Sequence, residues 1–250
     1  MVRMKTTNDY RDPNLPVADR VTDLLGRMPL EEKVAQVGSV WGPDLLEGER
    51  FSAEKADTIL CNGIGHVSRL GTASTLRPVE LASTANEIQR YILEKTRLGI
   101  PALLHEESCA GLTAREATQF PQAIGLASTW EPDLVQSMAD VIREEMVAVG
   151  ARHTLAPVLD VARDPRWGRC EESFGEDPYL VGRMGVAYVR GIQGASLAYG
   201  VAATGKHFLG YGAPEGGMNW APCQLPRREL FERILPPFEA AVREYCRKLG

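Results

Sequence analysis

Short apolar runs alternate with segments of helical apolar spacing along most of this chain. The helices are expected over residues 17–28, 30–37, 78–98, 131–149, 179–192 and 225–246, and the strands over residues 37–41, 64–67, 100–104, 155–161 and 200–204. Strands that alternate with helices are typical of parallel βαβ units. The order therefore predicts an α/β domain over residues 17–250, preceded by an N-terminal arm over residues 1–16.

Polar side chains follow three of the expected strands. The first group is His105, Glu106 and Glu107, the second lies within residues 163–172, and the third is Lys206 with His207. A (β/α) barrel builds its site from loops at the C-terminal ends of its strands. An open doubly wound sheet usually carries a Gly-rich phosphate turn, and the chain has no GxGxxG or GxxxxGK segment. We therefore expect a (β/α)8 barrel of the TIM type, but five strands are too few to close it, so about the first five βα units are present.

The segment of residues 163–172 combines both charge signs with Trp167. Arginine offers a fixed fork of donors and tryptophan a flat apolar face, which together suit a polar, ring-shaped ligand such as a sugar. A structural alternative is equally open for Arg163, Arg166 and Arg169, because each could pair with a neighbouring acid and only fold the loop. In the same way His207 could be a core histidine.

Composition narrows the class of protein and its partners. The chain has 250 residues, 44% hydrophobic and 24% charged, with a net charge of −5, which describes a globular protein without affinity for nucleic acid or an anionic membrane. It has no signal-peptide core and no apolar segment of membrane-spanning length. Its five cysteines are odd in number and form no CxxC pair, so we expect neither a disulfide framework nor a zinc site. The expected location is cytoplasmic.

Several segments taken together resemble glycoside hydrolase family 3. They are LHEESCAGL, RDPRWGR, ESFGEDP, KHF and GAPEGGMNWAP, and more loosely MPLEEKVAQV and ATQFPQAIGLASTW. The resemblance implies a retaining β-glycosidase of the β-glucosidase or β-xylosidase type, in which the N-terminal barrel domain holds the non-reducing-end sugar. It implies a β-linked oligosaccharide or glycoside as partner, and no metal or organic cofactor.

The resemblance also implies roles for four residues. Glu107 matches the family's acidic residue that binds sugar hydroxyls, Arg169 matches its sugar-binding arginine, and Lys206 with His207 matches its Lys-His pair. Glu107 would accept hydrogen bonds and the other three side chains would donate them, which suits a ring of sugar hydroxyls. Lys206 could instead pair with Glu172 and play a structural part.

The catalytic groups of the family are expected outside this chain. Its nucleophile is an Asp in a Ser-Asp-Trp-like segment, and the 250 residues contain no such segment. We therefore expect a partial family-3 barrel domain that is inactive alone and that self-associates through its open edges. The alternative is a non-catalytic sugar-binding protein or a decayed gene fragment. The hexosaminidase branch is rejected, because Tyr211 stands where that branch has a catalytic histidine.

Overall fold

Five short parallel strands form the central sheet of the computed structural model, which describes residues 9–249 and the side chains of residues 9–244. The strands are β1 (Ser39–Trp41), β4 (His66–Ser68), β5 (Leu103–Glu106), β6 (His153–Thr154) and β7 (Ala202–Ala203). They lie side by side in chain order, and all four neighbouring pairs are parallel. A separate antiparallel hairpin is formed by β2 (Leu46–Glu47) and β3 (Arg50–Phe51). Consecutive parallel strands of this kind make up the wall of a (β/α) barrel, as predicted.

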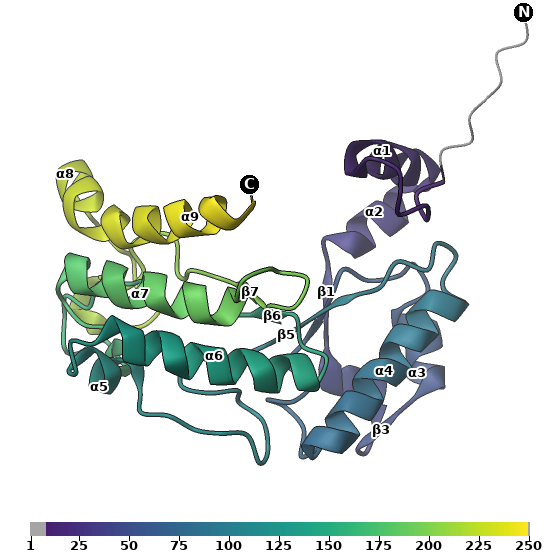
Figure 1. Ribbon diagram of the computed structural model, residues 1–250, viewed down its shortest axis with the longest axis horizontal. Helices are drawn as coiled ribbons and strands as arrows, with labels where there is room; N and C mark the ends of the chain where they lie inside the picture. Colours follow the sequence, from purple (N-terminus) through teal and green to yellow (C-terminus); the bar gives the residue numbers. More distant parts are fainter. Residues whose placement is uncertain (1–8, 250) are drawn as a thin grey trace, which may run out of the picture.

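Helices cover one face of this sheet (Figure 1). They are α1 (Val17–Arg27), α2 (Leu30–Gln36), α3 (Ala53–Ile59), α4 (Pro78–Lys95), α5 (Ala123–Ala127), α6 (Pro132–Ala148), α7 (Pro178–Gln193), α8 (Arg227–Glu229), a π-helical turn (Leu230–Ile234) and α9 (Leu235–Leu249). Figure 1 shows α6, α7 and α9 stacked beside one another near one end of the row of strands, and α3 and α4 near the other end. The six predicted helices are present, whereas α3 and α5 were not predicted.

The strand predicted over residues 155–161 is wrong as a strand and right as a buried segment. The regular ladder ends at Thr154, and Pro157 has no backbone N–H with which to extend it. The segment still runs beside the chain after β7, because Ala156 and Pro157 accept backbone hydrogen bonds from Thr204 and Lys206 at 2.9 and 3.0 Å. It therefore carries its polar end to the same rim as the regular strands.

Strand alternation separates the core from the other face of the sheet. Val67, Leu104 and Thr154 are buried against the helices. The alternating positions His66, His105 and His153 face the opposite way and are half-buried. The core between sheet and helices includes the fully buried side chains Ile88, Ile92, Val135, Ile142, Met146, Val181, Met184, Tyr188 and Ile192. The inner face of the sheet thus carries these three histidines, with Leu103 beside His66.

The described part of the expected N-terminal arm is attached to the fold. Tyr10 is buried against Met28 and Leu98, its N–H donates to the Asp23 carboxylate at 2.9 Å, and its carbonyl accepts from Arg20 at 2.7 Å. Residues 1–8 of the arm lie outside the described residues. In the part of the chain that the structure describes, no helix has both the length and the apolar character needed to cross a membrane.

Candidate functional site

Glu107 lies at the centre of an ion-pair network at the C-terminal ends of the strands. It directly follows β5, and its two carboxylate oxygens contact Arg69 Nη2 at 2.6 Å and Lys206 Nζ at 3.0 Å. Arg69 directly follows β4, and Lys206 lies three residues after β7. The partner of Lys206 is therefore Glu107, and the alternative pairing with Glu172 is not formed.

Electrostatics keep Glu107 ionised. Burial alone would raise the pKa of this carboxyl, but the charge of Lys206 and the hydrogen bonds from Arg69 and Lys206 outweigh it and hold the pKa of Glu107 below its usual value. The Arg69 guanidinium lies 5.4 Å from the centre of the Trp41 ring at the end of β1. A fixed negative acceptor between two cations is therefore present at this rim.

His207 is positioned by a buried carboxylate that sequence reasoning had not assigned to the site. The Asp160 side chain has no exposed surface, and its Oδ2 accepts from His207 Nδ1 at 2.7 Å and from the His207 backbone N–H at 3.0 Å. Its Oδ1 accepts from the Gly212 N–H at 3.2 Å. The His207 side chain is 28% exposed, so one edge of its ring remains open to a ligand. His207 is therefore not a core histidine.

Tyr211 lies between Arg169 and His207 and contacts both side chains. The Arg169 guanidinium makes two bonds to the Glu172 carboxylate, at 2.7 and 2.8 Å, and lies 5.8 Å from the Tyr211 ring centre. The Tyr211 and His207 ring centres are 4.7 Å apart. Burial would raise the pKa of Glu172, but the bond to Arg169 and the charges of Lys206 and His207 lower it. Tyr211 thus joins Arg169 to His207, and His207 directly follows Lys206, the partner of Glu107, so all four predicted residues lie in one cluster.

The other two arginines of the loop have structural partners. Arg163 pairs with Glu229 of α8, and Arg166 pairs with Asp164 at 2.6 Å. These pairs fix the fold of the loop, as the structural alternative predicted.

The expectation that Trp167 offers its face to a ring-shaped ligand is wrong. Its side chain is 1% exposed, its ring packs edge-on against Tyr211 at 6.0 Å, and its indole N–H donates to Asn219 at 3.3 Å. The loop uses this large side chain as its own core.

Sequence reasoning missed three site residues: Arg69, Asp160 and Tyr211. A signal existed for the first two. Arg69 follows the expected strand of residues 64–67 by two positions, and Asp160 lies near the end of the expected strand of residues 155–161. Tyr211 gave no comparable signal, because its position depends on how the chain folds back after β7.

Comparison with known proteins identifies the family. A family model described as the glycosyl hydrolase family 3 N terminal domain matches residues 29–247. The chain belongs to this family. Among its relatives, a beta-xylosidase of Formosa agariphila is 47% identical over 59% of the chain and 22% of its own length. A periplasmic beta-glucosidase of Salmonella typhimurium is 34% identical over 89% of the chain and 27% of its own length.

Two solved structures agree with the fold. A beta-glucosidase from Erythrobacter marinus superposes with a TM-score of 0.85 at 36% identity, covering 94% of this chain and 31% of its own. A beta-glucosidase from Listeria innocua in complex with glucose gives a TM-score of 0.76 at 32% identity, covering 90% of this chain and 31% of its own. The chain thus spans less than a third of these relatives, and its cytoplasmic location remains a prediction.

Proposed function

We propose that this family-3 chain binds the non-reducing-end sugar of a β-glucoside or β-xyloside for a retaining glycoside hydrolase. The observation that carries the proposal is Glu107, held ionised between Arg69 and Lys206 with His207 and Arg169 close by. Relatives named as beta-glucosidases and beta-xylosidases, one of them in complex with glucose, support this substrate class.

The donors and acceptors of the site match a ring of hydroxyls. Lys206 has three N–H donors and uses one of them in its hydrogen bond to Glu107. The Glu107 carboxylate has further lone pairs that its bonds to Arg69 and Lys206 do not use. A hydroxyl that donates to Glu107 can therefore accept from Lys206 at the same time. His207 and Arg169 extend the same pattern to the next hydroxyls of the ring. A ligand without these hydroxyls would leave buried polar groups unpaired, which disfavours its binding.

The chemistry needs two further carboxyl groups about 5–5.5 Å apart, one as nucleophile and one as acid/base. The described carboxylates Glu107, Asp160 and Glu172 are each held by two or three hydrogen bonds, which suits binding groups. We therefore give these three carboxylates binding roles, and we propose that the nucleophile and the acid/base lie outside the 250 residues.

A binding experiment tests the proposal. Methyl β-D-glucoside and methyl β-D-xyloside are titrated against the purified chain, with binding followed by ligand-observed NMR. We expect Lys206→Met to weaken binding about 10- to 100-fold, because a hydrogen bond to a charged group contributes about 1.5–3 kcal/mol. The exposed lysine of α2 supplies the control, and Lys33→Met should bind like the wild type. Binding that is absent, or equally weak in both variants, would overturn the proposal.

Hydrolysis separates a binding part from a complete enzyme. We expect the chain alone to release no phenol from aryl β-glucosides or β-xylosides at an enzyme-like rate, because no nucleophile is available for a covalent intermediate. Turnover that is abolished by Lys206→Met would show that the catalytic groups lie within the 250 residues. The reading frame downstream of codon 250 then decides between an enzyme part and the non-catalytic alternative, according to whether it encodes a Ser-Asp-Trp-like segment.

A further inference from the structure

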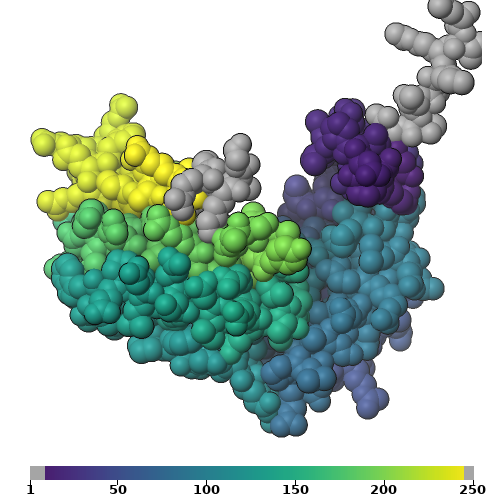
Figure 2. Space-filling view, viewed as in Figure 1, coloured from purple at the N-terminus to yellow at the C-terminus, as the bar shows by residue number. Residues whose placement is uncertain are grey.

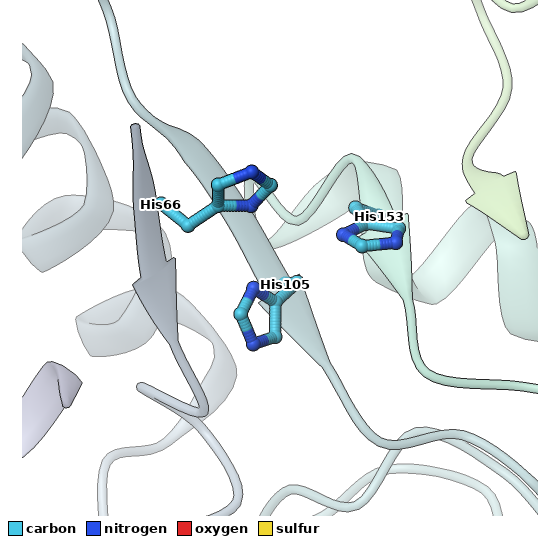
Figure 3. Close-up of side chains that lie close together, drawn as sticks. All are labelled: His66, His105 and His153. Atoms are coloured by element: carbon cyan, nitrogen blue, oxygen red, sulfur yellow. The ribbon is translucent and has the colours of Figure 1, made fainter. Parts of the chain in front are cut away.

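Three histidines from three adjacent strands gather on the inner face of the sheet (Figure 3). His66 lies in β4, His105 in β5 and His153 in β6, and their ring centres are 5.5–5.8 Å apart in all three pairs. His105 and His153 are direct neighbours in the strand register. His105 also precedes Glu107 by two residues and so shares its strand face. The cluster therefore lies one layer below the sugar site, toward the N-terminal ends of the strands.

The three rings present unpaired nitrogens. Nδ1 of His66, His105 and His153 is buried in each case and has no hydrogen-bond partner within the described residues. Buried polar atoms are nearly always paired, so three in one place call for an explanation. The potential ligand atoms of the three residues lie within 4.8 Å of one another. With Zn–N bonds of about 2.0–2.1 Å, tetrahedral ligand nitrogens are about 3.4 Å apart, so modest side-chain rotation would bring them onto one ion.

Two further features suit a metal. His153 Nε2 contacts Thr204 Oγ1 at 2.6 Å, and a ring that donates there keeps its Nδ1 lone pair for an ion, as the outer nitrogen of metal-binding histidines commonly does. Burial, with smaller effects of His153 and His66, lowers the pKa of His105 to about 4, and burial and His66 also lower the pKa of His153. Neutral imidazole is the form that binds metal ions.

We propose that His66, His105 and His153 bind a divalent metal ion of the zinc type through three imidazole nitrogens, with the fourth position left to water. Three neutral nitrogens in an open tetrahedral set favour zinc or cobalt over magnesium or calcium, which prefer oxygen ligands. The bound ion links β4, β5 and β6 beneath Glu107. No metal was expected from the sequence. The three histidines lie 39 and 48 positions apart along the chain, and no spacing motif marks them.

A metal titration of the purified chain, stripped of metal with a chelator, tests this site. We expect one Co²⁺ per chain, with the visible d–d absorption of a tetrahedral nitrogen site and without a thiolate charge-transfer band, and displacement by Zn²⁺. His66→Gln, His105→Gln and His153→Gln should each weaken binding at least tenfold. The fourth histidine is the matched control, because His207→Gln removes an imidazole outside the cluster and should keep the affinity.

A second measurement applies to the wild type alone, in case the cluster variants do not fold. Histidine ring NMR signals are followed while Zn²⁺ is added to one equivalent. Three of the four ring systems should shift together and that of His207 should not. The proposal is overturned by binding without saturation near one equivalent, by a thiolate band, or by an equal loss of affinity in His207→Gln. None of these results depends on whether the chain binds sugar.

Discussion

At the scale of single residues, Asp160 determines more of the site geometry than any of the sugar-binding candidates. Its buried carboxylate accepts three hydrogen bonds, two from His207 and one from Gly212. Both donors belong to the segment after β7, 47 and 52 residues further along the chain. Asp160 therefore orients the imidazole ring and fixes the return of the chain toward Tyr211 at the same time.

Replacing Asp160 by asparagine tests this positioning role. Asn has the same shape, but its NH2 group would face N–H donors, so one or two buried groups would lose their partners. We expect a loss of about 1–3 kcal/mol in the free energy of unfolding, measured by urea denaturation, together with weaker sugar binding. Glu171→Gln in the same loop is the control, because the Glu171 side chain is exposed and its replacement should matter little. Equal losses in the two variants would contradict the role given to Asp160.

Glu107 offers a test of sugar selection. Aspartate is one methylene shorter, so Glu107→Asp should open space for the hydroxymethyl group of a hexose. Both affinities can fall as contacts with Arg69 and Lys206 lengthen, and the readout is therefore the ratio of the xyloside and glucoside dissociation constants. We expect the ratio to move toward glucoside by about 1–3 kcal/mol. The exposed Glu171→Asp should leave it unchanged. If Glu107→Asp also leaves the ratio unchanged, Glu107 does not select the sugar.

At the scale of elements, the site depends on two loops that come into very close contact at two glycines. A Cβ atom at Gly217 would lie 2.6 Å from Cβ of Arg166 and 2.9 Å from the backbone nitrogen of Trp167. A Cβ atom at Gly212 would lie 2.9 Å from Cβ of Asp160. The glycines of the segment GAPEGG thus allow the loop after β7 to contact the loop that carries Arg169.

Replacing each of two adjacent glycines distinguishes the cost of close packing from the cost of backbone strain. Gly216 and Gly217 have φ angles of +65° and +72°, but a Cβ at Gly216 would meet nothing within 4 Å. We expect Gly216→Ala to cost about 1–2 kcal/mol in the free energy of unfolding, through the left-handed backbone alone. Gly217→Ala should cost about 1–3 kcal/mol more through overpacking, and it should weaken sugar binding as the loop moves. Equal values from urea denaturation would show that the loops do not pack as closely as described.

The difference between what the sequence predicted and what it missed has a physical basis at this same scale. Long amphipathic helices such as α4, α6 and α7 repeat their apolar spacing many times, so they were predicted to within a few residues. The five-residue α5 is too short to show the repeated apolar spacing of a helix. The contacts of Asp160 with His207, and the cluster of His66 with His105 and His153, depend on strand register and connect distant positions. The register between strands cannot be read from the spacing of residues in a single sequence.

At the scale of the whole molecule, two kinds of surface remain open: the edges of the sheet and the apolar side of α1. Within residues 9–249, the end strands β1 and β7 have a sheet neighbour on one side only. The helix α1 has no buried side chain, and Val17, Val21 and Leu25 on it are 70%, 46% and 49% exposed. In Figure 2 this helix, in dark purple, projects from one corner of the molecule. Open strand edges and apolar surfaces both favour contact with a second copy of the chain.

We therefore expect the purified chain to self-associate. Its mass, measured by light scattering after size exclusion, should rise above that of a monomer as concentration increases. The double variant Val21→Glu/Leu25→Glu places charges on the exposed apolar line of α1 and should lower the association, whereas Thr22→Glu, on a polar position of the same helix, should not. If the double variant associates as strongly as Thr22→Glu, the edges of the sheet carry the contact. A wild-type chain that stays monomeric at every concentration would mean that both surfaces are compatible with solvent, and the prediction would be wrong.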